Sequence, residues 1–146
     1  MRNPSTSPVR ASLYGQYMQE QYLGRYYAKA QNVRLRLRQE FERAFEEVDI
    51  IAMPTTPMKP EELPGPDAPY EEIVNKALFN LVNTCTFDLT HHPAITVPCG
   101  RSNGLPIGLM LVGKHFDEET ILRAAHAFEQ TGTYGDVRVG QAAAAG

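Results

Sequence analysis

The sequence predicts an α/β fold, and three features of its 146 residues support that class. Apolar residues recur at steps of three and four from Ala30 to Val48, the spacing that places side chains on one face of a helix. Short runs at 48–53, 94–97 and 107–112 are rich in β-branched or apolar residues, as strands are. Two further helical patterns lie between and after these runs. We therefore expect about three strands and three helices.

The first predicted helix starts between Ser12 and Tyr22 and continues to about Val48. Gly15 and Gly24 weaken its early turns by about 1 kcal/mol each relative to alanine. The strand at 48–53 that follows stops at Pro54 and suits a buried strand with helices on both faces. The expected organisation is a loose segment over 1–20, one domain region over 21–133 and a flexible tail over 134–146.

A proline-rich segment follows the first strand. Six prolines between Pro54 and Pro69 preclude regular structure, because each lacks an N–H group and restricts the residue before it. Loops longer than about 12 residues are often functional. The segment is therefore either the wall or lid of a site or a plain surface excursion.

The remaining elements are predicted from periodicity and capping. A second helix covers 71–87, with two acidic residues in its first turn, which the helix dipole favours. The strands at 94–97 and 107–112 pair as a hairpin across a loop at 101–104. A third helix starts after Asp117 as N-cap and ends near Gly132.

Composition and charge exclude several classes of function. The net charge of −3 and pI near 5.8 do not favour nucleic-acid binding. The run of Arg34, Arg36 and Arg38 is followed closely by glutamates, so we interpret it as a solvated helix face. No apolar stretch approaches the roughly 18 residues of a membrane span, and no signal peptide is evident. The expected location is the cytoplasm.

Four segments resemble the amidase-signature family of amide hydrolases. They are YYAKAQNVR at 26–34, FEEVDIIAMPTTP at 45–57, TCTFDLTHHPAITVPCG at 84–100 and GLPIGLMLVGKHFDEETILRAAHAF at 104–128. The resemblance implies the C-terminal portion of such an enzyme, a fragment of its mixed β-sheet with covering helices. Two residues depart from the pattern. His91 occupies a position where the family usually has glycine, which tolerates unusual backbone angles, and Met110 stands where many members have glutamine.

The resemblance also implies a reaction, hydrolysis of a carboxylic amide to acid and ammonia without a metal or organic cofactor. The family uses a serine nucleophile, a second serine on a cis peptide and a lysine base, all N-terminal to the matched region. This chain has no Gly-Gly-Ser-Ser stretch, and its serines are Ser5, Ser7, Ser12 and Ser102. We therefore expect no catalytic residue here and no activity from the chain alone. In the complete enzyme, the expected ligand is a small amide substrate. The expected protein partner is either a second copy of this chain or an N-terminal chain that carries the triad.

By analogy with the family, Met53, Thr55 and Thr56 border the acyl pocket and bind substrate. Strand ends and long loops are where α/β sheets place ligands, which favours the same position. The alternative is that Thr55 and Thr56 only satisfy turn hydrogen bonds between prolines.

Other chemistry is less well supported. Cys85 or Cys99 could pair with His91 or His92 as a Cys-His nucleophile. His91, Cys85 and Cys99 could together form a zinc site, but no recognised ligand spacing supports it. Reduced, buried thiols and structural histidines are commoner, so we expect no metal site and no disulfide. His115 and His126 are expected at a helix margin. The rival to a truncated amidase is a noncatalytic α/β module that binds a partner chain or an amide-like ligand.

Overall fold

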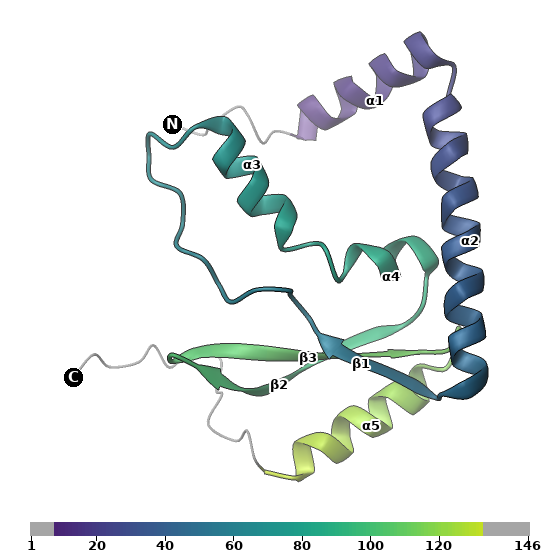
Figure 1. The fold of residues 1–146 in the computed structure, drawn as a ribbon, viewed down its shortest axis with the longest axis vertical. Coiled ribbons are helices and arrows are strands. Elements are labelled where there is room, and N and C mark those ends of the chain that lie inside the picture. The colour runs from purple at the N-terminus through teal and green to yellow at the C-terminus, as the bar shows by residue number, and fades with distance from the viewer. Residues whose placement is uncertain (1–7, 133–146) are drawn as a thin grey trace. The chain divides into compact units, whose positions relative to one another are not determined.

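The computed structural model describes residues 8–132, which belong to two compact units that divide between Glu40 and Phe41. The predicted α/β class is confirmed. The described residues form five helices and three strands, drawn in Figure 1: α1 (Pro8–Tyr22), α2 (Arg25–Glu47), β1 (Ile50–Pro54), α3 (Tyr70–Phe79), α4 (Cys85–Thr90), β2 (Ala94–Ser102), β3 (Leu105–Gly113) and α5 (Glu118–Gln130). Residues 1–7 and the predicted tail at 134–146 lie outside the described residues.

The first unit contains α1 and most of α2. α1 is helical from Pro8, where the sequence predicted a loose segment, and it runs through Gly15 without a break. The chain turns instead at Leu23 and Gly24, whose φ angles are 51° and 72°. Glycine adopts such angles without a Cβ penalty, so Gly24 fits the boundary between the two helices. The predicted domain limits themselves stay a prediction.

The second unit is built on a three-stranded antiparallel sheet with the order β1-β3-β2. The predicted hairpin is confirmed, with strands longer than expected and a turn at Asn103 and Gly104. β1 lies at an edge of the sheet and its residues alternate between partly buried and exposed, so the expected buried strand is not what forms.

Each face of the sheet carries its own apolar cluster, because successive residues of a strand point to opposite sides. The first cluster contains Phe45 of α2, Phe87 of α4, and Met110 and Val112 of β3, with Phe41, Ile51 and Met53 packed against it. The second contains Val97, Leu111 and Ala125, the last from α5. α4 and α5 therefore lie on opposite sides of the sheet, as Figure 1 shows. On α2, Phe45 is buried, whereas Ala44, which lies within the apolar periodicity between Ala30 and Val48, is exposed.

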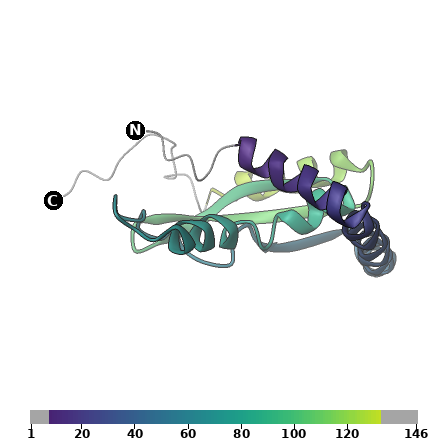
Figure 2. The ribbon, with the colours of Figure 1, turned by 90° about the horizontal axis from the view of Figure 1, so that it is seen from above.

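The helix predicted at 71–87 is two helices, α3 and α4, separated at residues 80–84. At the break, two polar side chains donate hydrogen bonds to backbone carbonyl groups. Asn80 Nδ2 donates to the Lys76 carbonyl at 2.9 Å, and Thr84 Oγ1 donates to the Leu81 carbonyl at 3.3 Å. Such bonds give the backbone an alternative to continued helix. α3 lies at the end of the second unit opposite the α2–β1 connection (Figures 1 and 2).

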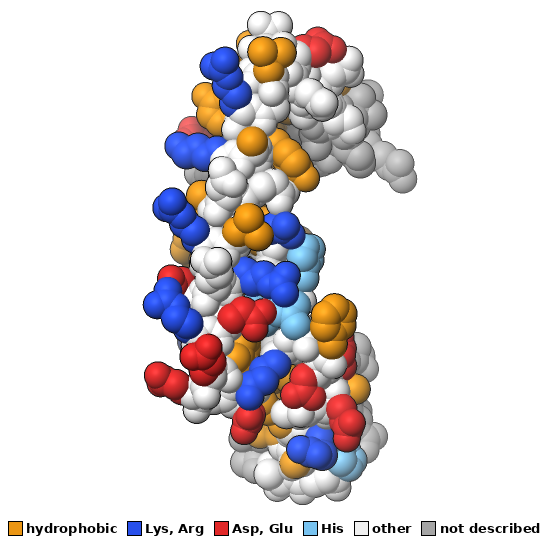
Figure 3. All heavy atoms as spheres, turned by 90° about the vertical axis from the view of Figure 1, so that its right-hand side faces the viewer, with side chains coloured by type: hydrophobic (Ala, Val, Ile, Leu, Met, Phe, Trp, Pro, Cys, Tyr) orange, Lys and Arg blue, Asp and Glu red, His pale blue; other side chains and the backbone are white. Residues whose placement is uncertain are grey.

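The helix after Asp117 is confirmed as α5, and Asp117 is its N-cap residue. Its carboxylate accepts the Thr120 hydroxyl at 2.7 Å and makes no bond to the backbone. In the space-filling view of Figure 3, basic side chains predominate over the upper part of the face, and acidic and basic side chains lie together over its lower part. Among the described residues, no helix combines the length and apolar character that crossing a membrane requires.

His91 has the strained backbone that the sequence predicted. It caps the C-terminus of α4 with φ 63° and ψ 25°, in the left-handed region. That conformation costs a non-glycine residue about 1–2 kcal/mol, partly offset by the lower backbone entropy of a histidine in the unfolded chain.

We therefore expect His91→Gly to raise the free energy of unfolding by up to about 1 kcal/mol. His126→Gly is the matched control, because His126 is exposed in the interior of α5, where glycine should cost about 1 kcal/mol. Urea unfolding of the two variants gives the comparison. A loss of stability in both would contradict the strain at His91.

Candidate functional site

Two threonines and a glycine meet where β1 ends. The Thr55 N–H donates to the Gly108 carbonyl at 3.0 Å, which extends the pairing of β1 with β3 by one residue. Thr55 Oγ1 lies 3.1 Å from Thr96 Oγ1 of β2, so the two hydroxyls share a hydrogen bond above β3. A Cβ at Gly108 would lie 2.7 Å from Thr55 Oγ1 and 2.8 Å from the Thr96 methyl carbon. Only glycine lets these side chains approach β3 so closely.

The proline-rich loop and α3 enclose a hollow beyond this strand end. Its volume is about 390 Å³, and it is lined by Thr56, Pro60, Glu61, Glu62, Leu63, Pro64, Ile73, Lys76, Ala77 and Asn80. Lys76 Nζ donates to the Glu62 carbonyl at 3.2 Å and lies 3.2 Å from the Glu72 carboxylate. At the base of the loop, Asn83 Nδ2 donates to the Pro54 carbonyl at 2.8 Å. The loop is thus tied to α3 and to the segment before α4.

The three predicted substrate-binding residues lie in different surroundings. Met53 packs against the apolar cluster of Phe45 and Phe87. Thr55 bonds to Thr96, while Thr56 donates to the Met58 carbonyl at 2.9 Å, which is a turn bond of the kind weighed as the alternative. Thr56 also lines the hollow. Their role in substrate binding stays a prediction.

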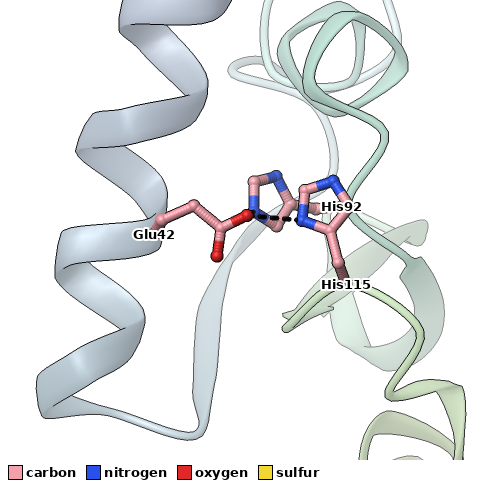
Figure 4. Close-up of side chains that lie close together, drawn as sticks. All are labelled: Glu42, His92 and His115. Carbon is pink, nitrogen blue, oxygen red and sulfur yellow. Dashed lines mark ion pairs between the residues drawn. The ribbon is translucent and has the colours of Figure 1, made fainter.

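A second polar cluster, not predicted from the sequence, joins Glu42, His92 and His115. Glu42 projects from α2 toward both rings (Figure 4), with Oε1 2.8 Å from His115 Nδ1 and 3.9 Å from His92 Nε2. The two ring centroids are 4.1 Å apart. The side chains are 43%, 0% and 12% exposed for Glu42, His92 and His115. His115 lies between β3 and α5, and His126 is exposed within α5.

Thr90 fixes the orientation of both rings. A carbonyl oxygen can only accept, so His115 Nε2 donates its hydrogen to the Thr90 carbonyl at 2.9 Å. The Thr90 hydroxyl donates its own hydrogen to the Thr86 carbonyl at 3.0 Å, and therefore accepts from His92 Nδ1 at 2.9 Å. Each ring thus donates one N–H to Thr90, and the other nitrogen, His92 Nε2 or His115 Nδ1, faces Glu42.

The charge of the cluster follows from this arrangement. With both rings neutral, two nitrogen lone pairs face a carboxylate, which repels them. With both rings protonated, two positive charges about 4 Å apart repel by on the order of 4 kcal/mol at an effective dielectric constant of about 20. A single proton shared with Glu42 leaves the second ring nitrogen facing the carboxylate, whereas a cation held between the three groups would be bound by the carboxylate and by both ring nitrogens.

The two cysteines, which were considered as a nucleophile or as zinc ligands, are not part of this cluster. Cys85 and Cys99 are free thiols, exposed and partly buried respectively, so the expectation that they are buried is wrong. Among residues 8–132, the one set of three or more potential metal ligands found close together is Glu42, His92 and His115. Neither cysteine belongs to it. Met110, at the position where glutamine was noted, is buried in the first apolar cluster.

The sheet with its covering helices and the strand-end loop give an α/β fold, and the comparisons with known proteins give its family. The chain belongs to the amidase family, because the family model described as Amidase matches residues 5–122. The resemblance noted in the sequence is therefore confirmed.

Three similar proteins illustrate the relationship. A protein described as lying in the nthA 5′ region of Rhodococcus erythropolis is 41% identical over 107 residues, covering 73% of this chain and 54% of that protein. A glutamyl-tRNA(Gln) amidotransferase subunit from Halalkalibacterium halodurans is 46% identical, over 77% of this chain and 22% of its own length. The crystal structure of the same amidotransferase subunit from Thermotoga maritima superposes with a TM-score of 0.61 and 28% identity, covering 83% of this chain and 26% of that one. The chain thus spans between about a fifth and about half of these relatives.

Proposed function

We propose that this chain forms the C-terminal part of an amidase that hydrolyses carboxylic amides to acid and ammonia, and that the serine, cis-serine and lysine come from outside it. The observation that carries the proposal is the hollow between the proline-rich loop and α3, which adjoins the family-matched strand end and includes Thr56. In the complete enzyme this wall would face the acyl group of the substrate. Met53, Thr55 and Thr56 are the proposed substrate-binding residues.

Open strand edges and exposed apolar side chains of the second unit support the proposal that this chain is part of a larger fold. Within the described residues the sheet has two open edges, the outer sides of β1 and β2, and open edges pair readily with other strands. α3 buries none of its residues. Apolar side chains of α3, of α4 and of the segment between them are each about half exposed: Leu78, Phe79, Leu81, Val82 and Leu89. Exposed apolar surface of this kind is typical of a face that another segment covers.

The names of the relatives support a partner chain. Two of them are named as one subunit of an amidotransferase, so the proteins of that name work with at least one other subunit. A chain that lacks its own catalytic groups would meet them either in a longer protein or in a separate subunit. The cytoplasm remains its proposed location.

The purified chain should release no ammonia from small amides such as benzamide. The physical reason is that amide hydrolysis by this family needs a hydroxyl activated by a base and donors aimed at the developing oxyanion, and this sequence contains no Gly-Gly-Ser-Ser stretch. The measurement is ammonia release over many turnovers. Sustained turnover that disappears on mutation of a residue in this chain would overturn the proposal.

The second candidate function is a noncatalytic α/β binding module. It is favoured by the two apolar clusters, which give the second unit a core on each face of its sheet. Sedimentation and thermal unfolding separate the two candidates. Self-association or loss of cooperative unfolding favours the amidase portion with uncovered surfaces, whereas a monomer that unfolds cooperatively favours the module.

A further inference from the structure

We propose that Glu42, His92 and His115 form a binding site for a divalent transition metal, with Zn²⁺ as the expected ion. The site lies wholly within the second unit and away from the strand-end hollow, and it does not depend on the proposed amidase function. Its three ligand atoms, one carboxylate oxygen and two imidazole nitrogens, all lie within 4.8 Å of one another. Two histidines and a glutamate are a ligand set that zinc uses.

The two distances from the Glu42 carboxylate fit zinc after a small adjustment. Zinc binds imidazole nitrogen at about 2.0–2.1 Å and carboxylate oxygen at about 2.0–2.2 Å, which places two ligands of a tetrahedron about 3.3 Å apart. The Glu42 oxygen is 2.8 Å from His115 Nδ1 and 3.9 Å from His92 Nε2. Each distance differs from the tetrahedral value by about half an ångström. Glu42 can make this shift because its side chain is 43% exposed.

The second layer of contacts orients both rings as metal ligands are oriented. Histidines that bind metals usually donate their other ring N–H to a carbonyl or hydroxyl, which fixes the tautomer. Here the fully buried Thr90 accepts from both rings, through its hydroxyl from His92 Nδ1 and through its carbonyl from His115 Nε2. The nitrogens left facing Glu42 are the ones that would bind the ion.

The contact between His115 and Glu42 also favours a cation over a simple hydrogen bond. Their atoms are 2.8 Å apart, yet His115 Nδ1 makes no hydrogen bond among the described residues. A Zn²⁺ ion would offset the charge of the carboxylate and accept a lone pair from each ring. Neither ring would then need to be protonated. The ion would join the end of α2 to the α4–β2 and β3–α5 connections.

Zinc titration of the full chain tests the site, with a chromophoric chelator as competitor and with Cys85→Ser and Cys99→Ser in every sample to remove thiolate ligands. We expect one Zn²⁺ per chain and a higher melting temperature with zinc. Glu42→Gln and His115→Gln should each weaken binding by about 10- to 100-fold. Glu46→Gln and His126→Gln are the matched controls, because both residues are exposed, on α2 and α5 respectively, and should leave affinity unchanged.

Circular dichroism establishes that each sample keeps its helical content, so a loss of binding reports on the ligands. Co²⁺ in place of Zn²⁺ should give the visible absorption of a tetrahedral site in the parent chain and not in Glu42→Gln. Failure of the folded parent chain to bind zinc would overturn the proposal. Binding that Glu42→Gln and His115→Gln leave unchanged would overturn it as well.

Discussion

Phe45→Ala should lower the free energy of unfolding by about 3–5 kcal/mol, the usual cost of removing a large buried aromatic ring. Phe45 is 3% exposed and packs with Phe87, Met110 and Val112 between the end of α2, α4 and the sheet. Its ring also lies 5.2 Å from that of His92. The cavity would open in the centre of this cluster. Because whole domains are stable by only about 5–15 kcal/mol, the variant should be largely unfolded at moderate urea concentrations.

Phe116→Ala is the matched control for this substitution. Phe116 is 90% exposed, so the same truncation should change the free energy of unfolding by no more than about 0.5 kcal/mol. Urea unfolding followed by circular dichroism measures both variants. Equal losses from the two would mean that α2 does not pack on the sheet through Phe45.

Gly108→Ala should lower the free energy of unfolding by about 1–3 kcal/mol, the usual cost of overpacking. The new methyl would lie 2.7 Å from Thr55 Oγ1 and 2.8 Å from the Thr96 methyl carbon, so at least one threonine must move. That movement breaks the hydroxyl pair and displaces the end of β1, where the proline-rich loop begins. The loss therefore combines steric strain with a hydrogen bond.

Gly65→Ala gives the comparison for Gly108. A Cβ at Gly65 would meet nothing within 4 Å, so alanine there should be neutral or stabilising by up to about 1 kcal/mol. Adding Thr96→Ser to Gly108→Ala removes the Thr96 methyl carbon, one of the two close atoms, and should recover part of the loss. If the double variant is no more stable than Gly108→Ala, the close approach to Thr96 is not the cause.

The sequence predicted the sheet elements best, because their signals are local. The three predicted strands, the hairpin and the helix after Asp117 are all present, although β1 is only partly buried and the hairpin strands are longer than expected. The predictions that failed concern where helices end, because local signals for continuing and for ending a helix compete there. Gly24 rather than Gly15 ends a helix, and polar bonds from Asn80 and Thr84 divide the helix predicted at 71–87. β1 lies at the edge because, within the described part of the chain, it pairs only with β3. The apolar periodicity of a strand does not indicate which strand it pairs with, so this position could not be predicted.

The strand-end site could be predicted in part, since Thr55 and Thr56 follow a strand and precede a long loop. Their different surroundings could not, because the contact of Thr55 with Thr96 spans 41 residues. Glu42, His92 and His115 were missed for the same reason. Each ligand comes from a different element, and no spacing motif links them. The one available signal was the pair of adjacent histidines, and the positive φ at His91 turns only His92 into the cluster.

Ammonia release by a joined protein tests most directly that this chain is the C-terminal part of an amidase. The chain is fused behind the N-terminal part of an amidase-family enzyme of known activity that carries the Gly-Gly-Ser-Ser stretch and the lysine. We predict no turnover from either part alone and sustained release of ammonia from small amides by the joined protein. A joined protein that folds cooperatively but releases no ammonia, or turnover by this chain alone, would contradict the account.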